Sequence, residues 1–334
     1  MAGSTSRLEP RGKEETARNP DRGRQMKTSV VVTLTLLVAL AALVSTGCSS
    51  SGTSPSDVVD WFLNAAWGGR ADFAGGSYMG ACIEWDSDDS IYALRGHGQD
   101  NSNEFWRYDI STDTWTQLAG GFNAYWSSTL AYTGGDHIYA IQGNGTDSFY
   151  RYSISGDSWE SMNDYPETGV RRAGKALVWP GSGDYLYAIK GNETTVFARY
   201  SQSGNSWEYL APIPDGVPYG GSICCGGGGR IYATAGDTSF YRYDIGTDAW
   251  TQVAPLPDEI DFGSSLCYDG EESLFMVRGD STSAFWRYDI PDDAWESMED
   301  TPTIVQSGGS LTSSGDAVYA LPGGGSAEFW AFKP

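Results

Sequence analysis

Short apolar segments alternate with polar turns along most of the chain, and they recur at a regular spacing. One segment has an aliphatic residue, an aromatic residue, a small or aliphatic pair, one variable residue and a closing glycine. Its six copies lie at 91–96, 138–143, 186–191, 231–236, 274–279 and 318–323. Each copy is short, rich in β-formers and bounded by glycine, so each predicts a buried β-strand that runs into a turn.

A second segment follows each copy and reads Phe, any residue, Arg, Tyr in five of the six units. These copies lie at 105–108, 149–152, 197–200, 240–243 and 285–288, whereas the sixth, at 329–332, has Ala331 in place of arginine. A polar turn then leads to a tryptophan in five units: Trp115, Trp159, Trp207, Trp250 and Trp295. A Gly/Ser-rich apolar segment precedes each unit. The pattern predicts four short strands per unit, which is one blade of a β-propeller.

The two ends of the chain complement each other. The last unit ends at Pro334 without a tryptophan strand, and residues 60–65 around Trp61 are similar to the fourth strand at 206–211. We therefore expect an all-β fold, a six-bladed β-propeller of four-stranded blades over residues 57–334. An N-terminal strand would complete the last blade, and closing the ring in this way removes an open sheet edge.

The repeat resembles the kelch repeat, which runs about 50 residues and folds as a four-stranded blade. The shared marks are the Ile-Tyr strand that ends in glycine, the Arg-Tyr-Asp strand and the tryptophan about seven residues later. Kelch repeats usually carry two glycines after the second strand, whereas this chain has a variable residue and then one glycine. The resemblance implies a galactose oxidase-like, six-bladed kelch propeller, a class that includes both binding proteins and enzymes.

The N-terminal residues 1–47 are predicted to be a signal or leader segment. Their apolar run, 29–44, follows Lys27 and leads to Gly47-Cys48, which resembles the lipobox of prokaryotic lipoproteins, although Ser45 replaces the usual leucine. The resemblance implies lipidation of Cys48, with 48–56 as a flexible Gly/Ser-rich tether.

The leader leaves two questions open. The apolar run is long enough to serve instead as an uncleaved anchor helix, and translation could start at Met1 or at Met26. Under either interpretation we expect an extracytoplasmic protein attached to the cell membrane, at the cell surface or in the periplasm, and we expect a monomer.

The net charge of −22 narrows the range of partners. An acidic chain repels phosphate backbones, so we expect no nucleic acid partner. The carboxylates favour solubility, and adaptation to high salt is an open alternative. No metal-ligand spacing is present, and the two histidines, His97 and His137, are expected on opposite faces, so we predict no metal and no cofactor.

Candidate ligand-binding residues are those that differ between blades on one loop-bearing face. They are Arg95, Gln142, Lys190 and Arg278 before the second-strand glycines, Arg171 and Arg172 in one loop between blades, and the loop aromatics Trp126 and Tyr219. A basic centre rimmed by aromatic rings suits an acidic sugar or a carboxylate-bearing peptide. The alternative is that these cations pair with loop aspartates such as Asp100, Asp147, Asp237 and Asp261.

The arginines of the Arg-Tyr segments recur in five blades, so we expect them to be structural, pairing with turn carboxylates or with carbonyls between blades. Four cysteines follow Cys48, at Cys82, Cys224, Cys225 and Cys267. Buried thiols and a disulfide between Cys224 and Cys267, which share a register in adjacent blades, are both open.

We expect the protein to act as a scaffold that binds a protein or glycan through the variable loops. The alternative function is an enzyme that acts on an acidic sugar, similar to a sialic acid mutarotase, an epimerase or a sialidase. No residue is assigned a catalytic role.

Overall fold

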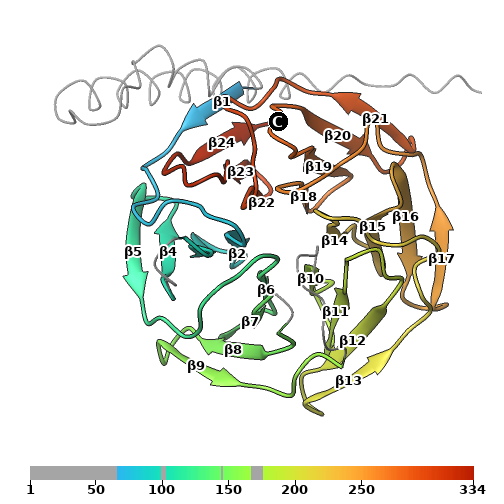
Figure 1. Ribbon diagram of the computed structural model, residues 1–334, viewed down its shortest axis with the longest axis horizontal. Coiled ribbons are helices and arrows are strands. Elements are labelled where there is room, and N and C mark those ends of the chain that lie inside the picture. The colour runs from blue at the N-terminus through green and yellow to red at the C-terminus, as the bar shows by residue number, and fades with distance from the viewer. Residues whose placement is uncertain (1–65, 99–102, 144–145, 167–175) are drawn as a thin grey trace, which may run out of the picture. The chain divides into compact units, whose positions relative to one another are not determined.

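The computed structural model describes residues 66–98, 103–143, 146–166 and 176–334 (Figure 1). The apolar run 29–44, the lipidation candidate Cys48, the tether, Trp61, Arg171 and Arg172 lie outside these residues. Among the described residues, no helix has the length and apolar character needed to cross a membrane.

Six antiparallel sheets of four strands are arranged around a central channel (Figure 1). Blade 1 holds β2 (Cys82–Trp85), β3 (Ser90–Leu94), β4 (Phe105–Asp109) and β5 (Thr114–Leu118). Blade 2 holds β6 (Thr129–Tyr132), β7 (His137–Ile141), β8 (Phe149–Ser153) and β9 (Ser158–Ser161). Blade 3 holds β10 (Ala176–Val178), β11 (Tyr185–Ile189), β12 (Phe197–Ser201) and β13 (Ser206–Tyr209).

The second half of the ring repeats this order. Blade 4 holds β14 (Ile223–Cys225), β15 (Arg230–Ala235), β16 (Ser239–Asp244) and β17 (Ala249–Gln252). Blade 5 holds β18 (Ser265–Tyr268), β19 (Ser273–Val277), β20 (Phe285–Asp289) and β21 (Ala294–Ser297). Blade 6 combines β22 (Ser310–Ser313), β23 (Val318–Leu321) and β24 (Trp330–Lys333) with β1 (Ala66–Gly69). The six-bladed all-β fold is therefore confirmed.

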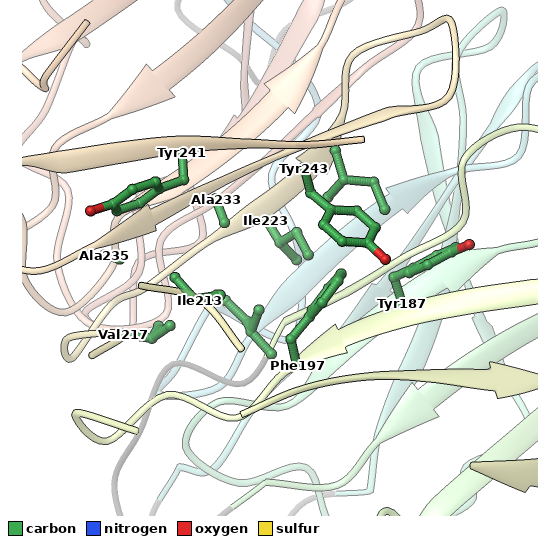
Figure 2. Packing of buried hydrophobic residues seen from close by; sticks show 11 residues of the cluster. Tyr187, Phe197, Ile213, Val217, Ile223, Ala233, Ala235, Tyr241 and Tyr243 are labelled. Carbon is green, nitrogen blue, oxygen red and sulfur yellow. The ribbon is translucent and has the colours of Figure 1, made fainter. Parts of the chain in front are cut away.

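The hydrophobic core lies between adjacent blades. Successive residues of a strand point to opposite faces of its sheet, so each blade buries side chains against both neighbours. Between blades 3 and 4, for example, Phe197 packs edge-on against Tyr243 with ring centroids 4.8 Å apart (Figure 2). The Phe and Tyr of the Phe-x-Arg-Tyr segment are thus interblade core residues, and their repetition follows from the repeated interface.

The chain closes the ring with Trp67, and the expectation that Trp61 would be the closing tryptophan is wrong. Strand β1 pairs with β24, and Trp67 lies opposite Phe332. The Trp67 indole Nε1 donates to the carbonyl of Glu299 at 3.1 Å, and its ring packs against Phe285. In blades 1 to 5 the fourth-strand tryptophan likewise donates to a carbonyl just after the preceding blade.

Close backbone contacts explain why the second strands end in glycine. Gly96 has φ +81°, and a Cβ on it would lie 2.5 Å from the Ala81 nitrogen and 2.6 Å from the Tyr78 carbonyl oxygen. Only glycine combines this left-handed conformation with so close a backbone approach.

Three of the five arginines of the Arg-Tyr segments pair with a carboxylate of their own blade. Arg151, Arg199 and Arg287 bind Glu160, Glu208 and Glu296, which lie opposite them on the outer strands. In blades 1 and 4 the residue opposite the arginine is a threonine, Thr116 or Thr251. The three paired arginines have the structural role expected from the sequence, but these glutamates belong to the neighbouring strand, not to a turn or to another blade.

Candidate binding site at the central channel

The inner strands of all six blades line a cavity of about 160 Å³ along the central channel. Its described wall is built from residues 80–84, 126–130, 176–177, 220–223, 262–266 and 307–311. These segments include the interblade loops that lead into each first strand, so the cavity extends inward from the loop-bearing face. Its volume is below the ~300–1,000 Å³ typical of pockets for drug-sized ligands, so it suits a narrow ligand or group.

Small polar residues in the wall accept hydrogen bonds from backbone N–H groups at the inner edges of the sheets. A strand at the edge of a sheet leaves N–H groups without a partner in that sheet. Here a hydroxyl of one blade accepts the N–H of the next blade: Ser310 from Ile83 at 3.1 Å, Thr129 from Leu177 at 3.3 Å, Ser222 from Leu266 at 3.1 Å and Ser265 from Leu311 at 2.9 Å. These hydrogen bonds explain the serine and threonine residues in the first strands, or just before them, of blades 2, 4, 5 and 6.

Three aromatic residues from three separate loops gather at the mouth of the channel. Trp126 precedes β6, Tyr219 precedes β14 and Phe262 precedes β18. The Phe262 ring stacks on Tyr219 at 5.4 Å and meets Trp126 edge-on at 6.5 Å. Tyr219 and Phe262 are each 37% exposed. We call Trp126, Tyr219 and Phe262 the mouth aromatics.

The predicted basic residues are held by partners in the loops. Arg95 pairs with Glu104 at 3.3 Å, donates to the Gly75 carbonyl and lies over the Tyr78 ring at 4.7 Å. Its guanidinium therefore joins its own blade to the preceding loop.

Arg278 shows the same behaviour in blade 5. Its Nε donates to the Glu259 carbonyl at 2.7 Å, and its guanidinium lies 3.4 Å from Asp258 and 3.7 Å from Asp280. The alternative weighed from the sequence, pairing with loop carboxylates, thus applies to both arginines, although with other carboxylates than the four named.

Of the other predicted residues, Gln142 is hydrogen-bonded within the loops and Lys190 is buried. The Gln142 amide donates to the Asn123 carbonyl at 3.0 Å, and Lys190 is 4% exposed. Neither they nor the two arginines belong to the cavity wall, which the structure shows to include Trp126. A basic ligand-binding centre therefore stays a prediction. Among the candidates in the described residues, the structure brings together Trp126 and Tyr219, which both contact Phe262.

Glu84 is a channel residue that the sequence analysis did not identify. It lines the cavity from β2, and its Oε1 accepts a 3.0 Å hydrogen bond from the Tyr132 N–H. Burial raises the pKa of Glu84 to about 8, and the Tyr132 hydrogen bond only partly opposes this. The same register holds an uncharged residue in every other blade: Ala131, Val178, Cys224, Cys267 and Thr312. Aligning the first strands would have revealed this exception.

The four cysteines of the propeller are free thiols. Cys82, Cys224 and Cys267 are buried, and burial raises the pKa of each well above its usual value. Burial also raises the pKa of Cys225 to about 12. The thiols therefore serve as small apolar residues at neutral pH, and the disulfide alternative is not realised in this structure.

Within the described ranges, no cluster of three or more His, Cys, Asp or Glu residues could hold a metal ion. His97 follows β3 and bridges to Met79, whereas His137 begins β7 at the opposite end of a second strand. The two histidines thus lie toward opposite faces.

The kelch motif matches residues 87–121, which span β3, β4 and β5 of blade 1. Together with the six four-stranded blades, this match supports a kelch-repeat β-propeller. A comparison with curated proteins finds no significant match.

Proposed function

We propose that the protein is a binding scaffold, tethered outside the cytoplasm through Cys48, that captures a protein or glycan partner at the channel mouth. The observation that carries this proposal is the assembly of Trp126, Tyr219 and Phe262 from three loops that are far apart in the sequence. A kelch propeller is in general suited to interaction through such loops.

The chemistry of the mouth aromatics supports recognition of a partner. Partly exposed aromatic rings supply large contact areas at low entropic cost, and they stack on sugar faces or on apolar peptide side chains. The wall beside them offers serine hydroxyls and glycine backbone groups, which can hydrogen-bond to a polar ligand. In the described part of the chain no arginine lines this cavity, so the acidic-sugar enzyme gains no support from it.

The test uses the full-length protein in detergent on glycan and peptide arrays, followed by affinity measurements with the ligand identified. Replacing Trp126, Tyr219 and Phe262 together by alanine should weaken that binding by at least about tenfold, since truncating a central aromatic often costs 2 kcal/mol or more. The matched control is Tyr209→Ala, which removes a 56% exposed tyrosine from the outer strand β13. Equal binding by the triple variant, at unchanged thermal stability, would reject the site.

The tether is tested separately. Cells that express the full chain should incorporate labelled fatty acid into the protein and retain it in the membrane fraction. Cys48→Ser should remove the label. Label that persists in Cys48→Ser would contradict lipidation at this residue, and unlabelled protein that stays in the membrane would favour the uncleaved helix.

A further inference from the structure

Glu84 is an acidic group in a channel whose described wall offers it no cation. The thiols that act on it electrostatically are those of Cys82 on β2, Cys225 on β14 and Cys267 on β18. Tyr92 on β3 lies opposite Glu84 in the sheet, and Arg107, the next residue along that row, lies on β4 beyond Tyr92. Its carboxylate accepts one backbone hydrogen bond, from the Tyr132 N–H. A half-buried carboxylate in such surroundings gains from a cationic partner.

Glu84 also forms the inner end of the cavity. On β6, β10, β14, β18 and β22 the lining ends at Leu130, Leu177, Ile223, Leu266 and Leu311, one register position before that of Glu84. Four residues separate Gly80, at the mouth, from Glu84, and the strand begins at Cys82, so this stretch of chain spans at most about 13 Å. A ligand that reaches the carboxylate from the mouth must therefore be long and narrow.

The mouth provides a second cation-binding feature. Trp126 and Phe262 line the outer part of the same cavity, and aromatic faces attract ammonium groups by cation–π interaction. The net charge of −22 attracts polycations to the protein as a whole. A ligand with two separated ammonium groups could therefore satisfy both ends of the cavity.

We propose that the central channel binds a linear aliphatic polyamine, with one ammonium group paired to Glu84 and another lying against Trp126 and Phe262. A free polyamine fits the depth better than a lysine of a partner protein, because a lysine side chain spans only about 6 Å at about 1.5 Å per bond. The site shares Trp126 and Phe262 with the proposed partner surface and adds Glu84 inside the channel, so Glu84→Gln tests it separately from partner capture.

Proton release is the signature of this site. Because burial raises the pKa of Glu84 to about 8, its carboxyl holds a proton at neutral pH. Pairing with an ammonium group requires the carboxylate, so binding at pH 7 should release close to one proton. Affinity should rise as pH increases from 6 to 8, by up to about tenfold per unit, and level off above that range.

The experiment is calorimetric titration of the full-length protein in detergent with spermidine, in two buffers of different ionisation enthalpy. Glu84→Gln keeps an oxygen that can accept from Tyr132, and it should weaken binding by about tenfold to a hundredfold, the value of a charge-assisted hydrogen bond. The matched control is Glu271→Gln, which removes an exposed carboxylate from the hairpin between β18 and β19 and should leave binding unchanged. N-acetyl-lysine methylamide should bind more weakly than spermidine.

Equal binding by Glu84→Gln and the wild type would overturn the proposal, because it would indicate general attraction to an acidic surface. Binding of the lysine amide as tight as that of spermidine would overturn the choice of a polyamine. If Glu84→Gln fails to fold, the wild-type proton count decides: release close to one proton supports the site, and no release overturns it. Loss of partner capture in the triple mouth variant is a separate result, since that measurement leaves Glu84 intact.

Discussion

The hydroxyl of Tyr152, on β8, donates a 2.6 Å hydrogen bond to the carboxylate of Asp157 in the turn that follows. The same Asp157 oxygen accepts the N–H of Ala119 at 2.8 Å, just after the last strand of blade 1. Trp159 donates to the carbonyl of Ala119 at 3.0 Å. Blade 2 therefore holds both backbone groups of one residue that follows blade 1.

The hydrogen bond between a tyrosine and the turn residue five positions later recurs in the other blades that carry an Arg-Tyr segment. The tyrosine-to-turn pairs are Tyr108 with Asp113, Tyr200 with Asn205, Tyr243 with Asp248 and Tyr288 with Asp293, at 2.6–2.8 Å. Each turn residue has a positive φ of 46–52°, which favours Asp and Asn over most other residues. The repeated turn of the sequence is thus an interblade fastening.

Asp157→Ala should lower the free energy of unfolding by about 1–3 kcal/mol, because it leaves the buried Tyr152 hydroxyl and the Ala119 N–H without their acceptor. Asp157→Asn should cost much less, since blade 3 uses Asn205 in the same role. Urea denaturation of the two variants and the wild type measures the difference. Equal destabilisation by Ala and Asn would indicate that the charge, not the acceptor geometry, matters.

The repeats made most of the fold predictable. The Phe-x-Arg-Tyr segment and the fourth-strand tryptophan recur because every interblade interface needs the same rings and hydrogen bonds. The closing strand was misplaced because Trp61 has a strand-like apolar context, whereas Trp67 precedes two glycines. The distance to the first strand is informative: Trp67 lies 15 residues before Cys82, as Trp207 lies 15 before Ser222.

The channel site was only partly predictable. Sequence comparison between blades identifies Trp126, Tyr219 and Phe262 as aromatics of the same kind of loop, but it does not predict that Phe262 contacts the other two. The contact of Phe262 with Trp126 joins loops of blades 5 and 2, on opposite sides of the ring. The basic residues were harder to interpret, because the partners of Arg278, such as Asp258, lie in a different loop, and only the fold shows that they meet.

Trp67→Ala should destabilise the protein by about 2–4 kcal/mol, because it removes the ring packed against Phe285 and Phe332 and the bond to Glu299. The strand that closes the ring would lose its main anchor to blade 5. Thermal unfolding of Trp67→Ala and Trp61→Ala compares the two candidate closing residues directly. A larger loss for Trp61→Ala would contradict closure through Trp67.

Arg95→Ala should reduce thermal stability while leaving ligand capture at the mouth intact. The substitution leaves Glu104 and the Gly75 carbonyl without the guanidinium in a half-buried site, at a cost of about 1–3 kcal/mol. Arg95→Lys should recover only part of this, because lysine cannot make the fork of hydrogen bonds. Unchanged stability together with lost capture would instead support a direct role of Arg95 in binding.

Glu84 should give the protein a distinctive dependence of stability on pH. Its folded-state pKa of about 8 lies above the usual 4.5, so the folded state binds more protons than the unfolded state between these values. The contribution of Glu84 is therefore fully present below pH 4.5 and is lost as pH rises through 8. Asp157 acts in the opposite sense and in another window. Hydrogen bonds from Tyr152 and Ala119 lower its pKa, so its contribution is lost only as pH falls below about 4.

The Glu84→Gln substitution isolates the pH dependence that comes from the raised pKa of Glu84. The variant and the wild type should unfold at similar denaturant concentrations at pH 5, where the Glu84 carboxyl is protonated in the folded state. At pH 9 the variant should be more stable by up to a few kcal/mol, because the wild type then carries a charged, half-buried carboxylate whose one hydrogen bond, from the Tyr132 N–H, only partly offsets its desolvation. Urea unfolding at both pH values measures this difference. If the free energies of unfolding of the variant and the wild type depend on pH in the same way, the pKa of Glu84 is the same in the folded and the unfolded state, which would contradict this prediction.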